Sequence, residues 1–197
     1  DQDIFSGLDI SYGTHTHQIL LNDGQGHFSV RANSGVEVLT RAAANAVFAD
    51  FNGDALLDLY IGMGGTTMAV PDVLMLGVGD GSFTNASSQL AGNSAQPSNG
   101  TTTCDYDNDG DLDIFVSTYG VSINAGLNIL WENDAGSFVN TAVDKNFASQ
   151  ATGNTYLEAT GYGTAIEPDK APGTFMGSNG FGIDCDDFNN DGNMDIF

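Results

Sequence analysis

The stretch DYDNDGDLD at residues 105–113, which runs straight into the apolar residues IFV at 114–116, decides the fold because it recurs along the chain. Two further segments align with it, DFNGDALLD at 50–58 and DFNNDGNMD at 187–195. Each is followed by apolar residues, and the N-terminal DQDIF at 1–5 carries the tail of a fourth copy. Self-similarity at a regular spacing is typical of repeat architectures. The chain is therefore first of all a repeat protein.

A phenylalanine that closes a turn forms a second marker at a fixed distance from each loop. Phe28, Phe83 and Phe138 each lie 25 residues after the last Asp of the preceding loop. The first two periods are 55 residues long, whereas the third is 82 and carries 27 more residues. We expect this extra length to form a surface insertion at about 141–180. The expected organisation is one domain, 1–197, with units at about 1–49, 50–104 and 105–186 and the start of a further unit at 187–197.

Short apolar segments between the two markers predict strands. Residues 46–48 enter the first complete loop and residues 59–61 leave it. Residues 73–76 then lead through a Gly-Asp-Gly turn into a strand that starts at Phe83. No segment sustains the 3.6-residue periodicity of a capped helix. About four short antiparallel strands per unit are the content of one propeller blade, so we predict an all-β chain of β-propeller blades.

The acidic loops have the chemistry of calcium sites. Ca²⁺ takes 6–8 oxygen ligands in a flexible shell, which a short loop can supply from side chains at positions 1, 3, 5 and 9 and a carbonyl at position 7. We expect three full Ca²⁺ sites and a truncated fourth. The predicted ligands are Asp50, Asn52, Asp54, the Leu56 carbonyl and Asp58; Asp105, Asp107, Asp109, the Asp111 carbonyl and Asp113; Asp187, Asn189, Asp191, the Asn193 carbonyl and Asp195; and Asp1 and Asp3.

Two other interpretations of the loops compete with this one. Solvated Asp-Gly turns would leave several carboxylates crowded together with no ion to offset their repulsion. An EF-hand shares the first six positions but needs a Glu at position 12. Position 12 is Ile61 in the first loop and Val116 in the second, which excludes the EF-hand.

The three loops are expected to differ in affinity. The first has Ala55 where the others have Gly110 and Gly192, and alanine tolerates a positive φ poorly. We therefore expect the first site to be the weakest or most distorted. The second loop carries the most carboxylates and is expected to bind most tightly.

Composition restricts the partners. The chain has 26 acidic against four basic residues and a net charge of −22, which disfavours nucleic acid and an anionic membrane surface as partners. No apolar run approaches the length of a membrane span, so membrane insertion is not expected. The two cysteines, Cys104 and Cys185, are too few for a disulfide framework and are compatible with one bridge or with two buried thiols.

These loops and turns resemble the FG-GAP/VCBS repeat family, the calcium-loop blades of integrin-α-type β-propellers. The resemblance rests on residues 49–62, 104–116 and 181–197, and on the turns that end at Phe28, Phe83 and Phe138. Phe181-Gly182 stands where the family has FG, whereas its GAP is not reproduced. The resemblance implies an extracellular propeller in which calcium stiffens each blade. Because three blades do not close a propeller, we expect a segment of a larger one, commonly seven-bladed in the family, or packing against other copies.

A few residues outside the loops deserve separate predictions. His15 and His17 lack an evident third metal ligand and are interpreted as surface histidines. Trp131 is expected in the core, although it could stack a sugar, as could Tyr156 and Tyr162. The sequons at Asn85 and Asn99 suggest a glycoprotein.

No motif of a catalytic triad or metalloprotease occurs, so we predict that the chain is not an enzyme. The predicted function is adhesion, recognition or assembly outside the cell, with a protein or glycan ligand or with further copies or blades as partners. The alternatives are a carbohydrate-binding propeller and a polysaccharide-active enzyme built around Glu158 or Glu167 in the insertion.

Overall fold

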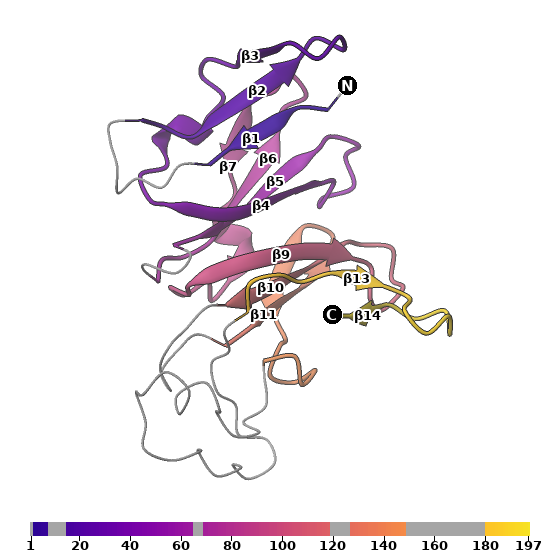
Figure 1. Cartoon of the computed structure of the whole chain (residues 1–197). Helices are drawn as coiled ribbons and strands as arrows, with labels where there is room; N and C mark the ends of the chain where they lie inside the picture. The colour runs from indigo at the N-terminus through magenta and orange to yellow at the C-terminus, as the bar shows by residue number, and fades with distance from the viewer. Residues whose placement is uncertain (1, 8–14, 65–68, 119–126, 149–179) are drawn as a thin grey trace.

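The computed structural model describes residues 2–7, 15–64, 69–118, 127–148 and 180–197. These residues form four β-sheets that follow one another along the chain and stack face to face (Figure 1). The described helical structure consists of two 3-10 turns, Val36–Val38 and Ser87–Gln89. The predicted all-β chain of propeller-like blades is confirmed.

The second and fourth sheets and the main part of the third begin with the strand before an acidic loop, whereas the first sheet begins with the strand after the truncated loop. The first sheet contains β1 (Ile4–Ser6), β2 (Gln18–Asn22) and β3 (Phe28–Val30). The second contains β4 (Ala43–Ala49), β5 (Asp58–Met63), β6 (Val73–Gly77) and β7 (Phe83–Asn85). The third contains β9 (Ser98–Cys104), β10 (Asp113–Thr118), β11 (Ile129–Asp134) and β12 (Ser137–Asn140), with β8 (Leu90–Ala91) added at its edge. The fourth contains β13 (Cys185–Asp186) and β14 (Asp195–Ile196).

The acidic loops are the hairpins between β4 and β5, between β9 and β10 and between β13 and β14. Ala49 pairs with Asp58, Cys104 with Asp113 and Asp186 with Asp195, so each loop is closed by an equivalent antiparallel pair. The strand after each loop is buried along its length in the second and third sheets because it lies between two neighbours and is covered on both faces. This explains why the apolar runs after the loops are continuous and do not alternate.

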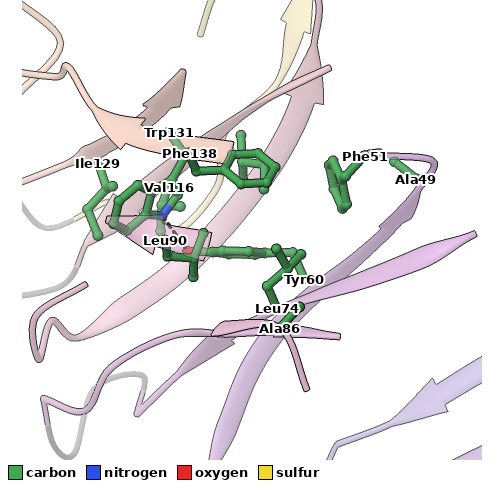
Figure 2. Packing of buried hydrophobic residues seen from close by; sticks show 11 residues of the cluster. Ala49, Phe51, Tyr60, Leu74, Ala86, Leu90, Val116, Ile129, Trp131 and Phe138 are labelled. Carbon is green, nitrogen blue, oxygen red and sulfur yellow. Dashed lines mark hydrogen bonds between the residues drawn. The ribbon is translucent and has the colours of Figure 1, made fainter. Parts of the chain in front are cut away.

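Three apolar clusters hold the stack together. The first cluster lies between the first and second sheets and includes Ile19, Leu59 and Ile61. The last cluster lies between the third and fourth sheets, around Phe115. The middle cluster joins the second and third sheets; it contains Tyr60 and Trp131, whose indole Nε1 donates a hydrogen bond of 3.0 Å to the tyrosine oxygen (Figure 2). Trp131 is 1% exposed, which confirms its predicted place in the core.

The connection to each following sheet covers the outer strand of that sheet. After β7, the chain forms β8, which pairs in parallel with β12 of the third sheet. In the equivalent segment after β3, the Ser34 carbonyl accepts a hydrogen bond of 2.7 Å from the N–H of Phe83, which starts β7. The outer edge strands are thereby partly paired and less open to association with other chains.

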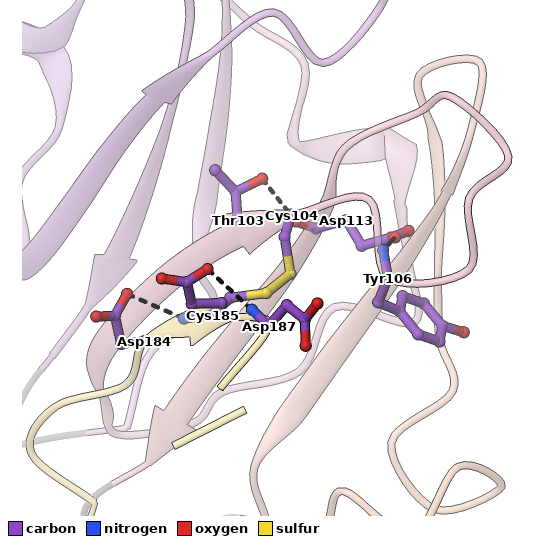
Figure 3. Close-up of a disulfide and its surroundings, with 8 residues drawn as sticks. Thr103, Cys104, Tyr106, Asp113, Asp184, Cys185 and Asp187 are labelled. Carbon is purple, nitrogen blue, oxygen red and sulfur yellow. Dashed lines mark hydrogen bonds between the residues drawn. A yellow bond between two sulfur atoms is a disulfide. The ribbon is translucent and has the colours of Figure 1, made fainter. Parts of the chain in front are cut away.

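The two cysteines form a disulfide between β9 and β13 (Figure 3). Cys104 lies one residue before its acidic loop and Cys185 two residues before the next one. Successive side chains point to opposite faces of a strand, so this offset of one residue lets one cysteine face forward and the other face back. The bridge ties the first strands of two consecutive sheets together at the base of their loops.

One prediction about the histidines is wrong. His17 is not a surface residue; it is fully buried, whereas His15 is exposed. The ring of His17 stacks on Phe5 and its Nε2 lies 2.8 Å from the Arg41 carbonyl oxygen. Burial is tolerated because an apolar ring face and a polar partner are both supplied by neighbouring segments.

Candidate metal centre

The structure places the predicted ligands of each site on a single hairpin. The first set lies between β4 and β5, the second between β9 and β10, and the third between β13 and β14. Asp3 immediately precedes β1 and is the equivalent of Asp58 and Asp113. Asp1, predicted as a ligand of the truncated site, lies outside the described residues.

The three loops share one backbone conformation despite their different sequences. At position 4, Gly53, Asn108 and Asn190 have φ of 75°, 62° and 61°. At position 6, φ is 67° in the first loop, 99° in the second and 89° in the third, where the residues are Ala55, Gly110 and Gly192. The predicted positive φ at Ala55 is therefore present. The tertiary structure imposes the same turn on alanine that glycine adopts freely.

Backbone N–H groups organise the carboxylates at positions 1 and 5. The position-1 side chain accepts from the N–H groups of positions 5 and 6 in every loop, at 2.8–3.1 Å. The position-5 Oδ1 accepts from the N–H of position 7 at 2.8 Å in the first loop and 2.9 Å in the other two. These bonds wrap the backbone around the acidic side chains, and each oxygen keeps a further lone pair for a cation.

In the first and second loops, the last Asp is the anchor that ties the loop to the sheet. Asp58 accepts from Phe51 N–H and Gly77 N–H, and Asp113 accepts from Tyr106 N–H and Asn133 N–H. Both are nearly inaccessible to solvent. Burial, followed by repulsion from the neighbouring acids, raises the pKa of Asp113 to about 6 and raises the pKa of Asp58 as well. A cation in the loop would favour the charged form of these groups.

The second loop gathers the most acidic oxygen atoms. Ligand atoms of Asp105, Asp107 and Asp109 all lie within 4.8 Å of one another. In the first and third loops an Asn stands at position 3, and its Nδ2 lies 3.2 Å and 3.1 Å from the position-5 carboxylate. Desolvation and the Asp109 carboxylate raise the pKa of Asp107. This arrangement is costly without a positive charge.

The donor set fits Ca²⁺ better than a transition metal. Carboxylate, amide and carbonyl oxygens are hard ligands, and the loops contain no His or Cys. None of the ion pairs among the described residues includes a loop carboxylate: Arg31 pairs with Asp80, Lys145 with Glu132 and His27 with Asp23.

Sequence reasoning did not identify the residue that supports each anchor from the third strand. Asn22, Gly77 and Asn133 donate their N–H to Asp3, Asp58 and Asp113 at 2.9 Å. They lie 19, 19 and 20 residues after those acids, so a third, nearly constant spacing in the repeat could have revealed them. A Cβ at Gly77 would collide with the Leu57 carbonyl oxygen, which accounts for glycine there.

The other predicted functional residues are distributed as follows. Asn85 is exposed at the end of β7, whereas Asn99 lies on β9 and donates its Nδ2 to the Gly180 carbonyl at 3.0 Å. Asn85 is thus the more accessible sequon. Buried Trp131 has no face free to stack a sugar. Tyr156, Tyr162, Glu158 and Glu167, which carried the carbohydrate alternatives, lie outside the described residues.

Comparison with known families gives one match. Residues 66–116 match the FG-GAP-like repeat, a span that runs from before β6 to the end of the apolar run after the second acidic loop. The resemblance derived from the loops is confirmed by this match. No curated protein matches the chain.

Proposed function

Because the chain contains an FG-GAP-like repeat within a stack of propeller-like blades, we propose that it is a calcium-stabilised, extracellular β-propeller module. Its role is non-catalytic: adhesion, recognition or assembly outside the cell. The observation that carries the calcium proposal is the common geometry of three acidic loops, in which the second brings Asp105, Asp107 and Asp109 within 4.8 Å. Position-1, -3, -5 and -9 side chains and the position-7 carbonyl hold the ion.

Charge supports a stabilising role for the metal. The chain has a net charge of −22, and its acids are concentrated in the loops at one end of each sheet. Self-repulsion of this size destabilises a compact state. Ions that bind the folded chain stabilise it by mass action, by about 2.7 kcal/mol for a site at a free concentration of 100 Kd.

Several features support an extracellular location. Disulfides persist in oxidising compartments, and the bridge between β9 and β13 fits such a compartment. FG-GAP repeats typically occur in extracellular proteins. Among the described residues, no helix is long and apolar enough to cross a membrane.

Calorimetric titration with Ca²⁺, combined with thermal unfolding, tests the proposal. We expect binding at the loops and a Tm that rises with free Ca²⁺ and falls on addition of a chelator. Asp109→Ala removes a carboxylate from the most acidic loop and should weaken binding at that loop at least tenfold, since charge-assisted ligation is lost. Asp23→Ala is the matched control because Asp23 lies on the exposed hairpin between β2 and β3, two sheets away. An unchanged Tm in chelator, with no heat of binding, would refute the proposal.

A further inference from the structure

We infer that Asn133 couples the first and second calcium loops, so that occupancy of one raises the affinity of the other. This inference rests on the proposed calcium sites and concerns a residue that is not a ligand. Asn133 lies near the end of β11 and is 1% exposed, between the second and third sheets. Its side chain forms hydrogen bonds to backbone atoms of both loops.

The Asn133 amide bridges the backbones of both loops. Its Nδ2 donates to the Phe51 carbonyl of the first loop at 2.9 Å and to the Leu112 carbonyl of the second loop at 3.0 Å. The two accepting carbonyls fix the orientation of the amide, since both require a donor. Phe51 lies between the predicted ligands Asp50 and Asn52, and Leu112 lies between the ligand positions 111 and 113.

The hairpin that follows Asn133 adds two hydrogen bonds and a close approach to the first loop. The Asn133 Oδ1 accepts from Gly136 N–H at 2.9 Å, which fixes the turn between β11 and β12. In that turn, Ala135 N–H donates to the Asp111 carboxylate of the second loop at 2.8 Å. A Cβ at Gly136 would lie 3.3 Å from the Asn52 Cβ of the first loop. Residues 133–136 thus touch both loops at once.

Comparison within the repeat shows that the bridge is a special feature of the third sheet. The equivalent residue of the second sheet is Gly77, which supplies the same N–H to its anchor but has no side chain. In the first sheet, Asn22 is the equivalent, and its Oδ1 accepts from Gly24 and Gly26 of its own turn. The bridge between loops is therefore not required by the blade architecture itself.

The coupling follows from the shared cost of ordering the two loops. Metal binding at the first loop fixes the Phe51 carbonyl, which in turn fixes Asn133 and the 133–136 hairpin. The second loop then has fewer degrees of freedom left to order when its own ion binds. Because coupling free energies are reciprocal, the second site favours the first by the same factor.

The test measures the Ca²⁺ affinity of the second site twice, once with the first site intact and once with the first site disabled. The loops carry Phe51, Tyr106 and Phe188 at position 2, so Tb³⁺ emission sensitised by Tyr106 reports the second site, with Tyr106→Phe as the specificity control. Affinity for Ca²⁺ is read by displacement of Tb³⁺. In the otherwise wild-type chain, Asp54→Ala in the first loop should weaken the second site by about fivefold or more. In the Asn133→Ala background, adding Asp54→Ala should change the Ca²⁺ affinity of the second site by no more than about twofold.

A matched control separates coupling from loss of stability. Asn45 bonds Thr101 across the same two sheets but lies at the end of β4 away from the loop, so Asn45→Ala should lower Tm yet preserve the fivefold effect of Asp54→Ala. The coupling is refuted if Asp54→Ala lowers the Ca²⁺ affinity of the second site equally with and without Asn133. It is also refuted if Asp54→Ala has no effect on that affinity in either background. In both cases calcium binding itself stands. If the wild-type chain binds neither Tb³⁺ nor Ca²⁺, the proposed function and the coupling both fail.

Discussion

At the residue scale, Ala55 holds a backbone conformation for which the other two loops have glycine at the equivalent position. Its φ of 67° lies in the left-handed region, which costs an L-residue about 1–2 kcal/mol. Its N–H is nevertheless required, because it donates to Asp50 at 2.8 Å. The loop therefore stores strain at one position to keep a hydrogen bond in place.

Replacing this alanine should relieve that strain. We expect Ala55→Gly to raise the free energy of unfolding by about 1 kcal/mol, after subtraction of the added freedom of glycine in the unfolded chain. The affinity of the first loop for Ca²⁺ should rise with it. Urea unfolding and calcium titration measure the two effects.

The reciprocal change in the second loop is the control. A Cβ on Gly110 would meet no atom within 4 Å, so Gly110→Ala tests the backbone conformation without a steric clash. It should lower stability by about 1 kcal/mol. Equal stability of both variants and the wild type would show that the sixth position is not strained.

Asp72 is the second residue whose environment makes a prediction. It is 1% exposed between the second and third sheets, and accepts from Tyr60 Oη at 2.6 Å, Ser98 Oγ at 2.7 Å and Met63 N–H at 2.8 Å. Burial raises its pKa to about 6, while the hydrogen bonds lower it. Burial also raises the pKa of Tyr60 well above its ordinary value, so the phenol stays neutral.

The sign of the pH dependence follows from this raised pKa. Between about pH 4 and pH 6 the folded chain keeps a proton on Asp72 that the unfolded chain has lost, so stability falls as pH rises through this window. In calcium-free buffer, the free energy of unfolding of the wild type relative to Asp72→Asn should fall by roughly 2 kcal/mol between pH 4 and pH 7. Urea unfolding at each pH provides the measurement. A difference between the two proteins that does not change with pH would contradict the prediction.

At the scale of elements, the fourth sheet depends on one covalent link. The described part of this sheet is a two-stranded ribbon, β13 and β14, and isolated ribbons of this kind are marginally stable in water. The disulfide joins it to β9 across a sequence separation of 81 residues. Closing a loop of that length removes much of the freedom of the unfolded chain.

Reduction of this bridge should therefore destabilise the ribbon most. We expect dithiothreitol, or the double variant Cys104→Ala/Cys185→Ala, to lower the free energy of unfolding by about 4 kcal/mol. Amide exchange should accelerate first at residues 185–196 and later in the buried strands β5 and β10. The double variant, which has no bridge, serves as the control and should not respond to reductant. Identical unfolding curves of the wild type with and without reductant would contradict this role.

At the scale of the whole molecule, stability is distributed along a stack in which each sheet contacts its neighbours. Apolar clusters fill the spaces between sheets, and polar bridges such as Trp131–Tyr60–Asp72 lie within them. Stability in such arrays is close to a sum of unit and interface contributions. The proposed metal sites lie at the hairpin ends of these sheets, and the first loop also contacts the third sheet through the Phe51 carbonyl and Asn133.

The sequence by itself determined the repeat, the strands around each acidic loop and the all-β class. These properties are local: Asp and Gly at fixed positions specify a turn, and continuous apolar runs specify buried strands. Phe28, Phe83 and Phe138 marked equivalent strands correctly, since each pairs with the equivalent residue of the preceding strand, although the third turn is shorter than the first two.

Only the tertiary structure decided which groups from different units meet. The burial of His17, the pairing of Cys104 with Cys185 and the bridge made by Asn133 each join segments far apart in sequence. Such contacts depend on the stacking of one sheet on the next, which local spacing does not encode. Ala55 gives the clearest case, since its sequence disfavours the turn that its hydrogen bonds and neighbouring strands nevertheless impose.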